Sequence, residues 1–400
     1  MILVLNLGSS SLKFKVYSQN VNECLCCGLY ERIGCISSNL HIKTKNVDLS
    51  FSICLQNHRD AICSMKKILI DEKLGILNDF SEITSIGHRV VHGGDYFEKP
   101  VLIDDFVIEK IRELSILAPI HNAINLEGIL DCIIEFPNVP QIAVFDTSFF
   151  CNLPEKVKKY PIPNELSEKY KIKRYGFHGI SHNNVYNNYK KEFLKNDIKV
   201  ISCHLGNGSS ICAIENGKPI DISMGFTPLE GLIMGTRSGS LDPSVVTYLI
   251  EKCSLCSNEV EIILNKKSGL LGISEVSSDV RDLINNNDEK CKLAIDMYCY
   301  SIVKYIGAYF VSLKGIDAIL FTGGIGENFE IREKICNDLK CLDIKIDNNL
   351  NKIVSNQSGL VSSKNSKIDI FVSKSDEEFS IAQEVYKYIN TQTNSVKVSP

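Results

Sequence analysis

The sequence has no apolar run long enough to cross a membrane and no excess of basic residues. Lysine and arginine number 44 against 48 acidic residues, for a net charge of −4. Nucleic-acid-binding proteins usually carry a basic excess, so this composition argues against a nucleic-acid partner. Residues 1–17 lack a charged segment ahead of an apolar one and predict a strand rather than a signal peptide. We therefore expect a cytoplasmic protein without a membrane or nucleic-acid partner.

Metal and disulfide motifs are equally sparse. The chain has 16 cysteines, which we expect to be free thiols in a reducing compartment because no secretory segment precedes them. The CxxC at residues 253–256 has no second pair, so a helix end is a better interpretation than a zinc or redox site. Two histidine pairs have metal-ligand spacing but lack the HExxH carboxylate, which leaves zinc as their minor alternative: His88 with His92, and His178 with His182.

The composition is that of a globular protein. Its 400 residues are 44% hydrophobic and 23% charged, enough for two or three domains with substantial cores. An apolar strand at 2–5, a glycine–serine turn at 8–11 and an alternating strand at 12–17 predict a β-hairpin. Residues 200–211 repeat this design, which predicts two related halves facing a cleft. The proline- and lysine-containing run at 153–163 is the best boundary signal between them.

The remaining periodicity predicts a mixture of helices and strands. In chain order these are a helix at 57–69, a strand at 83–91, a helix at 122–134, and strands at 141–145 and 318–321. The strand at 141–145 leads directly into Asp146. A final helix is expected from Asp376, where Ser375 and Glu378 fit an S-x-x-E capping box.

Three glycine-rich turns each follow an apolar strand, at 8–11, 206–210 and 321–328. Such turns expose backbone N–H groups that can bind phosphate oxygens, although any tight hairpin also favours glycine. The chain contains no GxxxxGK[ST] loop, and the glycines at 323–326 lack the spacing of a dinucleotide fingerprint. A nicotinamide-dependent enzyme is therefore disfavoured, and three phosphate-binding turns favour a nucleotide.

Eight motifs in order along the chain carry a resemblance: NLGSSSLK (6–13), HRVVHGG (88–94), APIHN (118–122), FDTSF (145–149), GFHGISH (176–182), HLGNGSS (204–210), GTRSGSLDP (235–243) and FTGGIGEN (321–328). Together they closely resemble the acetate kinase family over nearly the whole chain, with 20–73 the least similar stretch. The resemblance implies an α/β fold of two duplicated actin-like (ribonuclease H-like) domains with a nucleotide cleft between them. The expected domains are 1–150, completed by the C-terminal helix 376–400, and the nucleotide-binding domain 151–375.

The implied activity is reversible, Mg²⁺-dependent, in-line transfer of the γ-phosphoryl group of ATP to acetate, giving acetyl phosphate and ADP. By resemblance, Arg89 would bind the carboxylate and Arg237 would stabilise the transition state, since a guanidinium fork suits both groups. Asp146 would be the catalytic carboxylate. Because acetate needs no deprotonation at neutral pH, ordering the transition state or holding Mg²⁺ is a better role for Asp146 than general base. His178 would donate to the moving phosphoryl group.

The resemblance also implies metal and nucleotide positions. Mg²⁺, with Mn²⁺ as an alternative, would lie at Asn6 and Glu377, because this ion needs few protein ligands. The family commonly has Asn-Glu-Glu where this chain has Asp376-Glu377-Glu378, which leaves the exact ligand open. The positions implied for ATP are Lys13, His204, Leu205, Gly206, Asn207, Gly208, Asp279, Val280, Arg281, Gly324, Ile325, Gly326, Glu327 and Asn328.

The methyl group of acetate would lie in a small apolar slot formed by Val91, Ile120, Phe177 and Pro228, for which ordinary core packing is the competing interpretation. A propionate or butyrate kinase of the same fold is the nearest alternative function. An ATPase of the superfamily that is not a kinase is a more distant one, which an acyl phosphate assay would distinguish. The family further implies a homodimer.

Overall fold

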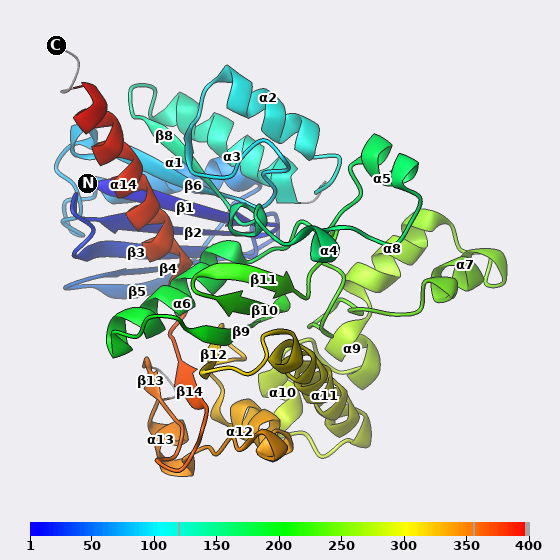
Figure 1. Cartoon of the computed structure of the whole chain (residues 1–400). Helices are drawn as coiled ribbons and strands as arrows, with labels where there is room; N and C mark the ends of the chain where they lie inside the picture. The colour runs from blue at the N-terminus through cyan, green and yellow to red at the C-terminus, as the bar shows by residue number, and fades with distance from the viewer. Residues whose placement is uncertain (119–120, 355–356, 397–400) are drawn as a thin grey trace. The chain divides into compact units, whose positions relative to one another are not determined.

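A computed structural model describes every residue except 119–120, 355–356 and 397–400. The chain divides into two compact units, which are coloured along the chain in Figure 1. Unit 1 contains Met1–Ser148 and Asp376–Pro400, and unit 2 contains Phe149–Ser375. Each unit has one mixed β-sheet with packed helices, which confirms the expected α/β class.

The unit 1 sheet has the strand order β5-β4-β3-β2-β1-β6-β8-β7. Its strands are β1 (Ile2–Gly8), β2 (Ser11–Tyr17), β3 (Cys24–Glu31), β4 (Ser38–Thr44), β5 (Asp48–Ile53), β6 (Ser85–Val90), β7 (Val101–Leu102) and β8 (Gln141–Phe145). The strands from β1 to β5 form an antiparallel meander, whereas β6 pairs in parallel with both β1 and β8. The predicted strands at 2–5, 12–17, 83–91 and 141–145 all lie in this sheet.

The helices of unit 1 cover the buried central strands. They are α1 (His58–Leu69), α2 (Asp105–Leu114), α3 (His121–Glu135) and α14 (Glu377–Val396), with a 3₁₀ turn at Phe80–Glu82. A second 3₁₀ turn, Ser148–Phe150, spans the boundary between the two units. Both α3 and α14 pack against β1 and β6. Gly87 of β6 permits the close approach of α14, because a Cβ there would lie 2.7 Å from Val385 and 2.9 Å from Ile381. The predicted helices at 57–69 and 122–134 are confirmed.

The unit 2 sheet has the order β11-β10-β9-β12-β14-β13. Its strands are β9 (Lys199–Leu205), β10 (Ser209–Glu215), β11 (Lys218–Ile222), β12 (Ala318–Thr322), β13 (Gly359–Leu360) and β14 (Asp369–Val372). Its helices are α4 (Glu155–Lys158), α5 (Asn164–Tyr170), α6 (Gly179–Phe193), α7 (Pro243–Glu251), α8 (Ser257–Lys266), α9 (Gly269–Ser274), α10 (Val280–Ile284), α11 (Glu289–Ser312), α12 (Phe329–Asp338) and α13 (Asn348–Ile353), with a 3₁₀ turn at Lys340–Leu342.

The central strands of the two sheets share one topology. In unit 1 the antiparallel strands β3-β2-β1 are followed by the parallel strands β6 and β8, and in unit 2 β11-β10-β9 are followed by β12 and β14. The two similar hairpins predicted from the sequence are β1–β2 and β9–β10, at equivalent places in this repeat. No helix in the described part of the chain is both long and apolar enough to cross a membrane.

Candidate active site

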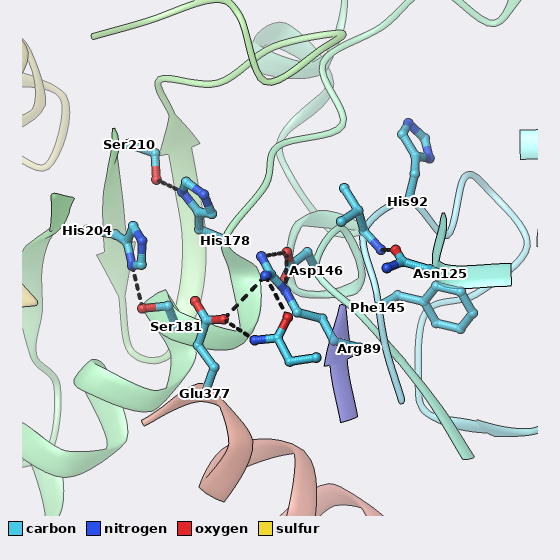
Figure 2. A network of polar contacts seen from close by, with 12 residues as sticks. Arg89, His92, Asn125, Phe145, Asp146, His178, Ser181, His204, Ser210 and Glu377 are labelled. Atoms are coloured by element: carbon cyan, nitrogen blue, oxygen red, sulfur yellow. Dashed lines mark hydrogen bonds and ion pairs between the residues drawn. The ribbon is translucent and has the colours of Figure 1, made fainter. Parts of the chain in front are cut away.

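Arg89 and Asp146 meet at the carboxyl edge of the unit 1 sheet. Arg89 lies in β6 and Asp146 directly follows β8, so the parallel pairing of these strands brings both side chains to one edge. Arg89 donates to Oδ2 of Asp146 from Nε at 3.0 Å and from Nη2 at 2.5 Å (Figure 2). Burial acts to lower the pKa of Arg89, but attraction to Asp146 and Glu377 outweighs burial and raises that pKa. The guanidinium is therefore held in its charged form.

Asn6 connects this ion pair to the start of α14. Its Oδ1 accepts from Nη1 of Arg89 at 3.2 Å, and its Nδ2 donates to Glu378 Oε1 at 2.9 Å and to Glu377 Oε2 at 3.3 Å. Arg89 Nη1 also lies 3.4 Å from Glu377 Oε2. Asn6 and Glu378 are buried, and Glu377 is more exposed. The two positions implied for Mg²⁺, Asn6 and Glu377, are thus in contact with each other and with Arg89.

Asp376, rather than Ser375, caps α14, so the expected capping box is wrong. Asp376 Oδ1 accepts the backbone N–H of Phe379 at 2.9 Å and forms an ion pair with Lys15 at 2.7 Å. The helix begins at Glu377, one residue later than the box requires, and the Ser375 N–H donates to Glu327 Oε1 instead. Because Asp376 is engaged in capping and Glu378 is turned toward Asn6, the three acidic residues have different surroundings.

The oxygens at this place suit a hard divalent cation. Mg²⁺ prefers one or two carboxylates and keeps several waters, and Asn6, Glu377 and Glu378 supply amide and carboxylate oxygens within one hydrogen-bonded group. In the part of the chain that is described, no group of three or more His, Cys, Asp and Glu side chains could hold a metal. The three side chains offer oxygen ligands, which suit Mg²⁺, whereas structural zinc sites are built mainly from Cys and His.

In unit 2, His178 and Arg237 converge on the glycine-rich turn between β9 and β10. A Cβ added to Gly208 would lie 3.4 Å from Nη1 of Arg237 and 3.5 Å from Nε2 of His178. A side chain at this position would fill the space between the two donors. Arg237 also donates from Nη1 to the carbonyl oxygen of Pro228 at 3.2 Å, and burial lowers the pKa of its guanidinium.

Three histidines of unit 2 lie against one another beside this turn. The ring centroids of His178 and His204 are 4.2 Å apart, and those of His182 and His204 are 6.3 Å apart. Each ring is held by serine hydroxyls: Ser181 contacts His204 Nδ1 at 2.7 Å and Ser210 contacts His178 Nδ1 at 3.0 Å (Figure 2). The sequence-predicted residues His178, His204 and Arg237 are thereby brought to one end of β9 and β10.

A cavity of about 470 Å³ lies beside the same turn in unit 2. It is lined by Gly206, Asn207, Ser278, Asp279, Val280, Arg281, Gly324, Ile325 and Asn328. Eight of these nine were implied as ATP positions, and Ser278 is the addition. Asp279 caps α10 and forms an ion pair with Arg281. The cavity has the size typical of sites for small ligands.

The loop between β12 and α12 forms one wall of this cavity. The N–H groups of Ile325 and Gly326 both donate to the Leu205 carbonyl oxygen, at 2.8 and 3.0 Å. Gly323 has a φ of +83°, and a Cβ there would lie 2.5 Å from that oxygen, so only glycine fits the turn. Arg332 stabilises the loop by donating a hydrogen bond from Nη1 to the Gly326 carbonyl oxygen at 3.0 Å.

The remaining predicted positions are distributed over both units. Val91 is buried in unit 1, where its N–H donates to Asn125 Oδ1 at 3.1 Å, and Lys13 is exposed on β2 opposite Asn6. Phe177 is buried in unit 2, whereas Pro228 is half-buried. Ile120 lies outside the described residues.

Sequence reasoning missed four side chains: Ser202, Ser210, Ser278 and Arg332. Ser210 belongs to the HLGNGSS motif, which drew attention to its glycines as a phosphate-binding turn rather than to its hydroxyls. Arg332 is fully buried, and its Nε and Nη2 donate to Oδ1 and the carbonyl oxygen of Asn351, both at 2.8 Å. The only sequence signal for Arg332 was its proximity to the glycine-rich loop.

Comparison with known proteins gives a consistent result. The sequence model of the Acetokinase family matches residues 1–383. An acetate kinase of Thermosipho melanesiensis is 49% identical over 397 residues, covering 97% of either chain. The crystal structure of Porphyromonas gingivalis acetate kinase matches with a TM-score of 0.89 and 40% identity, covering 97% of this chain and 99% of that one. A propionate kinase structure from Francisella tularensis subsp. tularensis matches with a TM-score of 0.89 and 41% identity, covering 96% and 98%. The chain therefore belongs to the acetokinase family.

Proposed function

We propose that the chain is an acetate kinase, which transfers the γ-phosphoryl group of ATP to acetate and forms acetyl phosphate and ADP. The observation that carries this proposal is the full-length similarity to proteins named acetate kinase, at 44–49% identity. In the reaction an acetate oxygen bonds to the γ-phosphorus while the bond to the β,γ-bridging oxygen breaks. Acetate is already ionised at neutral pH, so no proton has to be removed from it.

The contacts within each unit support a division of roles. In unit 1, Arg89 would bind the acceptor carboxylate, and Asp146 would hold the Arg89 guanidinium in place and order the transition state. In unit 2, Arg237 and His178 would donate to the equatorial oxygens of the transferring group, because both reach the Gly208 turn. His204 would lie beside the ATP phosphates. This arrangement relies on positioning and charge rather than on a covalent intermediate.

Unit 2 would bind the nucleotide in the 470 Å³ cavity, with Asp279 to Arg281 and Gly324 to Asn328 around the adenosine part. Residues 1–150 with the helix 376–400 would be the N-terminal actin-like domain, and 151–375 would be the nucleotide-binding domain, within two residues of the boundary between units 1 and 2. Backbone N–H groups of the Leu205–Gly208 turn would face the phosphates. Lys13, which is exposed on β2, would lie near the nucleotide by the same resemblance.

Mg²⁺, or Mn²⁺ in its place, would be held by Glu377 and Asn6 with Glu378 behind them. When bound, the ion would neutralise charge on the phosphate oxygens of ATP. The protein's own contribution is to orient these oxygens: Asn6 donates to both glutamates and Lys15 faces Glu378 Oε2 at 3.6 Å. Removing free divalent ions with a chelator should abolish turnover, and adding Mg²⁺ should restore it.

A propionate kinase is the second candidate, because a structure bearing that name is as similar to this chain as the acetate kinase structure. The test is to measure ADP and acyl phosphate formation with ATP, Mg²⁺ and a panel of acetate, propionate and butyrate. Acetate should give the highest kcat/KM. A higher value for propionate would favour the second candidate. ATP hydrolysis at the same rate without any acid would indicate an ATPase.

The assembly and location are part of the same proposal. The enzyme would work as a homodimer in the cytoplasm, on small-molecule substrates and without a nucleic-acid or membrane partner. Light scattering at working concentration should give twice the 44.7 kDa mass of the chain. A monomeric mass would contradict the dimer without affecting the proposed reaction.

A further inference from the structure

Ser210 joins two histidines of unit 2. Its Oγ lies 3.0 Å from Nδ1 of His178 and 2.7 Å from Nε2 of His182. The other ring nitrogen of His182, Nδ1, lies 2.7 Å from Oγ of Ser202. The four side chains therefore form a continuous hydrogen-bonded chain in the order Ser202, His182, Ser210, His178, whose last contact is drawn in Figure 2. The proposed function gives a role only to His178.

His182 restricts where the protons of this chain can lie. Its ring is fully buried, and burial together with the nearby His204 lowers its pKa well below the ordinary value. A neutral imidazole has one donor and one acceptor nitrogen, and a serine hydroxyl has one proton to donate. The hydrogen bonds that join these four side chains must therefore all be donated in the same direction, either toward His178 or away from it.

We propose that Ser210 and His182 are positioning residues that hold His178 as the Nε2–H tautomer, with this N–H directed to an oxygen of the transferring phosphoryl group. In this arrangement Ser202 donates to Nδ1 of His182, the Nε2–H of His182 donates to Ser210, and Ser210 donates to Nδ1 of His178. The inference rests on the proposed kinase function. It adds which residues keep Nε2 of His178 protonated, so that His178 can donate a hydrogen bond as that function requires.

The phosphate-binding turn selects this direction of the chain. Nε2 of His178 lies 3.5 Å from the place that a Cβ on Gly208 would occupy, whereas Nδ1 contacts Ser210. Phosphoryl oxygens can only accept hydrogen bonds from the protein. The opposite direction would place the lone pair of a neutral His178 on Nε2, toward those oxygens, where it would repel them.

The backbone holds the two histidines in this relationship. His178 has a left-handed conformation, with φ 60° and ψ 26°, at the N-terminus of α6, and its carbonyl oxygen accepts from the His182 N–H at 2.9 Å. Such conformations are uncommon outside glycine and collect at functional sites. The four-residue spacing of His178 and His182, a minor metal-site signal in the sequence, places both rings on one serine hydroxyl.

The kinetic test compares three serine-to-alanine variants of the full-length enzyme. Ser210→Ala should lower kcat by roughly 10- to 100-fold, by analogy with the loss of a hydrogen-bond partner that orients a metal-bound histidine. Its KM values for acetate and ATP should stay within about twofold, since the contact acts on the transferring group. Ser202→Ala should cause a smaller loss, because the Ser210 hydroxyl remains. Ser301→Ala is the control: it removes a part-buried hydroxyl that donates only to the Tyr298 carbonyl oxygen. Ser210→Thr, which keeps a hydroxyl, should restore most of kcat.

The direct test is ¹⁵N NMR of histidine-labelled enzyme, with the His178 signals assigned by His178→Asn. The wild-type enzyme should show an unprotonated Nδ1 and a protonated Nε2 at His178, and Ser210→Ala should give a mixture of tautomers. A protonated Nδ1 in the wild-type enzyme would overturn the inference, even if the Ser210 variants fail to fold. An unchanged tautomer in Ser210→Ala would also overturn it. Absence of acyl phosphate formation by the wild-type enzyme would instead contradict the proposed function, and the tautomer would still be measured.

Discussion

Arg89 directs two of its donors, Nε and Nη2, to a single oxygen of Asp146 rather than to the two oxygens of its carboxylate. Its third nitrogen, Nη1, faces Asn6 and Glu377. The guanidinium thus links the proposed acceptor site to the proposed metal position within unit 1. A substrate carboxylate that binds Arg89 has to share it with these acidic neighbours.

Arg89→Ala should therefore affect both binding and stability. Loss of the guanidinium should raise KM for acetate strongly, since the fork that would pair with the carboxylate is removed. Asp146 is 1% exposed, so breaking its ion pair with Arg89 should also lower the free energy of unfolding, by about 3–5 kcal/mol. Initial rates against acetate concentration and urea unfolding measure the two effects. An unchanged KM for acetate with a raised KM for ATP would show that Arg89 does not bind the acetate carboxylate.

The matched variants are Asp146→Asn and the double variant that combines Arg89→Ala with Asp146→Asn. Asp146→Asn should nearly abolish turnover but keep ATP affinity within about tenfold, or roughly 1.4 kcal/mol. Combining it with Arg89→Ala removes the buried negative charge that had lost its Arg89 partner, so the double variant should regain much of the lost stability without regaining acetate affinity. Near-normal turnover of Asp146→Asn would reduce this residue to a structural partner of Arg89.

Arg237→Lys should lower kcat far more than it raises KM for acetate. Lysine keeps the charge but loses the fork, and the contact is proposed to act mainly in the transition state. Burial lowers the pKa of Arg237 at this position. The ordinary pKa of a lysine side chain is about 10.4, whereas that of arginine is above about 12. The activity of the variant should therefore fall as pH rises through the alkaline range, while the wild-type enzyme keeps its charge. Parallel pH profiles of kcat test this, and an unchanged kcat would exclude Arg237 from the mechanism.

The three acidic residues at the start of α14 should respond differently to neutralisation. Glu377→Gln should raise the Mg²⁺ concentration needed for half-maximal activity, because it neutralises a carboxylate that contacts both Asn6 and Arg89. Asp376→Ala should cost about 1 kcal/mol of stability through the lost cap, and Asp376→Asn should retain most of it because asparagine also caps.

Glu378→Gln separates the alternatives for the metal ligand. Glutamine can still contact Asn6, so we expect a smaller change in Mg²⁺ requirement than for Glu377→Gln. Titrations of activity with Mg²⁺ at saturating ATP compare the three residues directly. A larger shift for Glu378→Gln would make Glu378 the ligand and Glu377 its support.

The sequence predicted the parts of this fold that depend on local pattern. Alternating and continuous apolar runs identified β1, β2, β6 and β8, and the glycine-rich turns marked where the strands end. The start of α14 was misplaced by one residue, because Ser375 and Asp376 are both good caps and Lys15, distant in sequence, stabilises the second. The contact of Ser210 with His182 joins residues 28 positions apart, which periodicity within one element does not reveal.

Val91→Ala should change the preference between acids. An apolar pocket distinguishes one methylene by about 1–3 kcal/mol, so propionate should be a poorer but detectable substrate of the wild-type enzyme. If Val91 faces the acetate methyl, the variant should raise kcat/KM for propionate relative to acetate by up to about tenfold. Val90→Ala is the control, since Val90 is fully buried in the core beside it and should lower stability alone. An unchanged ratio in Val91→Ala would assign Val91 to the core.

Arg332 is a fully buried cation that donates hydrogen bonds to Gly326 and Asn351. It thereby joins the loop between β12 and α12, the proposed nucleotide loop, to α13. Burial lowers its pKa to about 10, so the guanidinium is still charged at neutral pH. Arg332→Met fills similar volume but leaves three acceptor oxygens without this donor, at about 1–3 kcal/mol each if they stay unsatisfied. We expect a lower Tm and a raised KM for ATP, because the Gly324–Asn328 wall of the cavity loses its support, while KM for acetate changes little.

Ile335→Val is the matched control for Arg332→Met, because it trims a fully buried side chain of the same helix, α12, and should cost about 0.5–1.5 kcal/mol. It should lower Tm without changing KM for ATP, because it leaves the Gly326 contact in place. Arg332→Lys keeps the charge but cannot reach all three oxygens with one fork, so its KM for ATP should lie between the wild-type and Arg332→Met values. Steady-state rates against ATP concentration and thermal unfolding of all three variants show whether Arg332 positions the nucleotide loop. If KM for ATP follows Tm equally in Ile335→Val and Arg332→Met, Arg332 contributes only general stability and does not position the nucleotide loop.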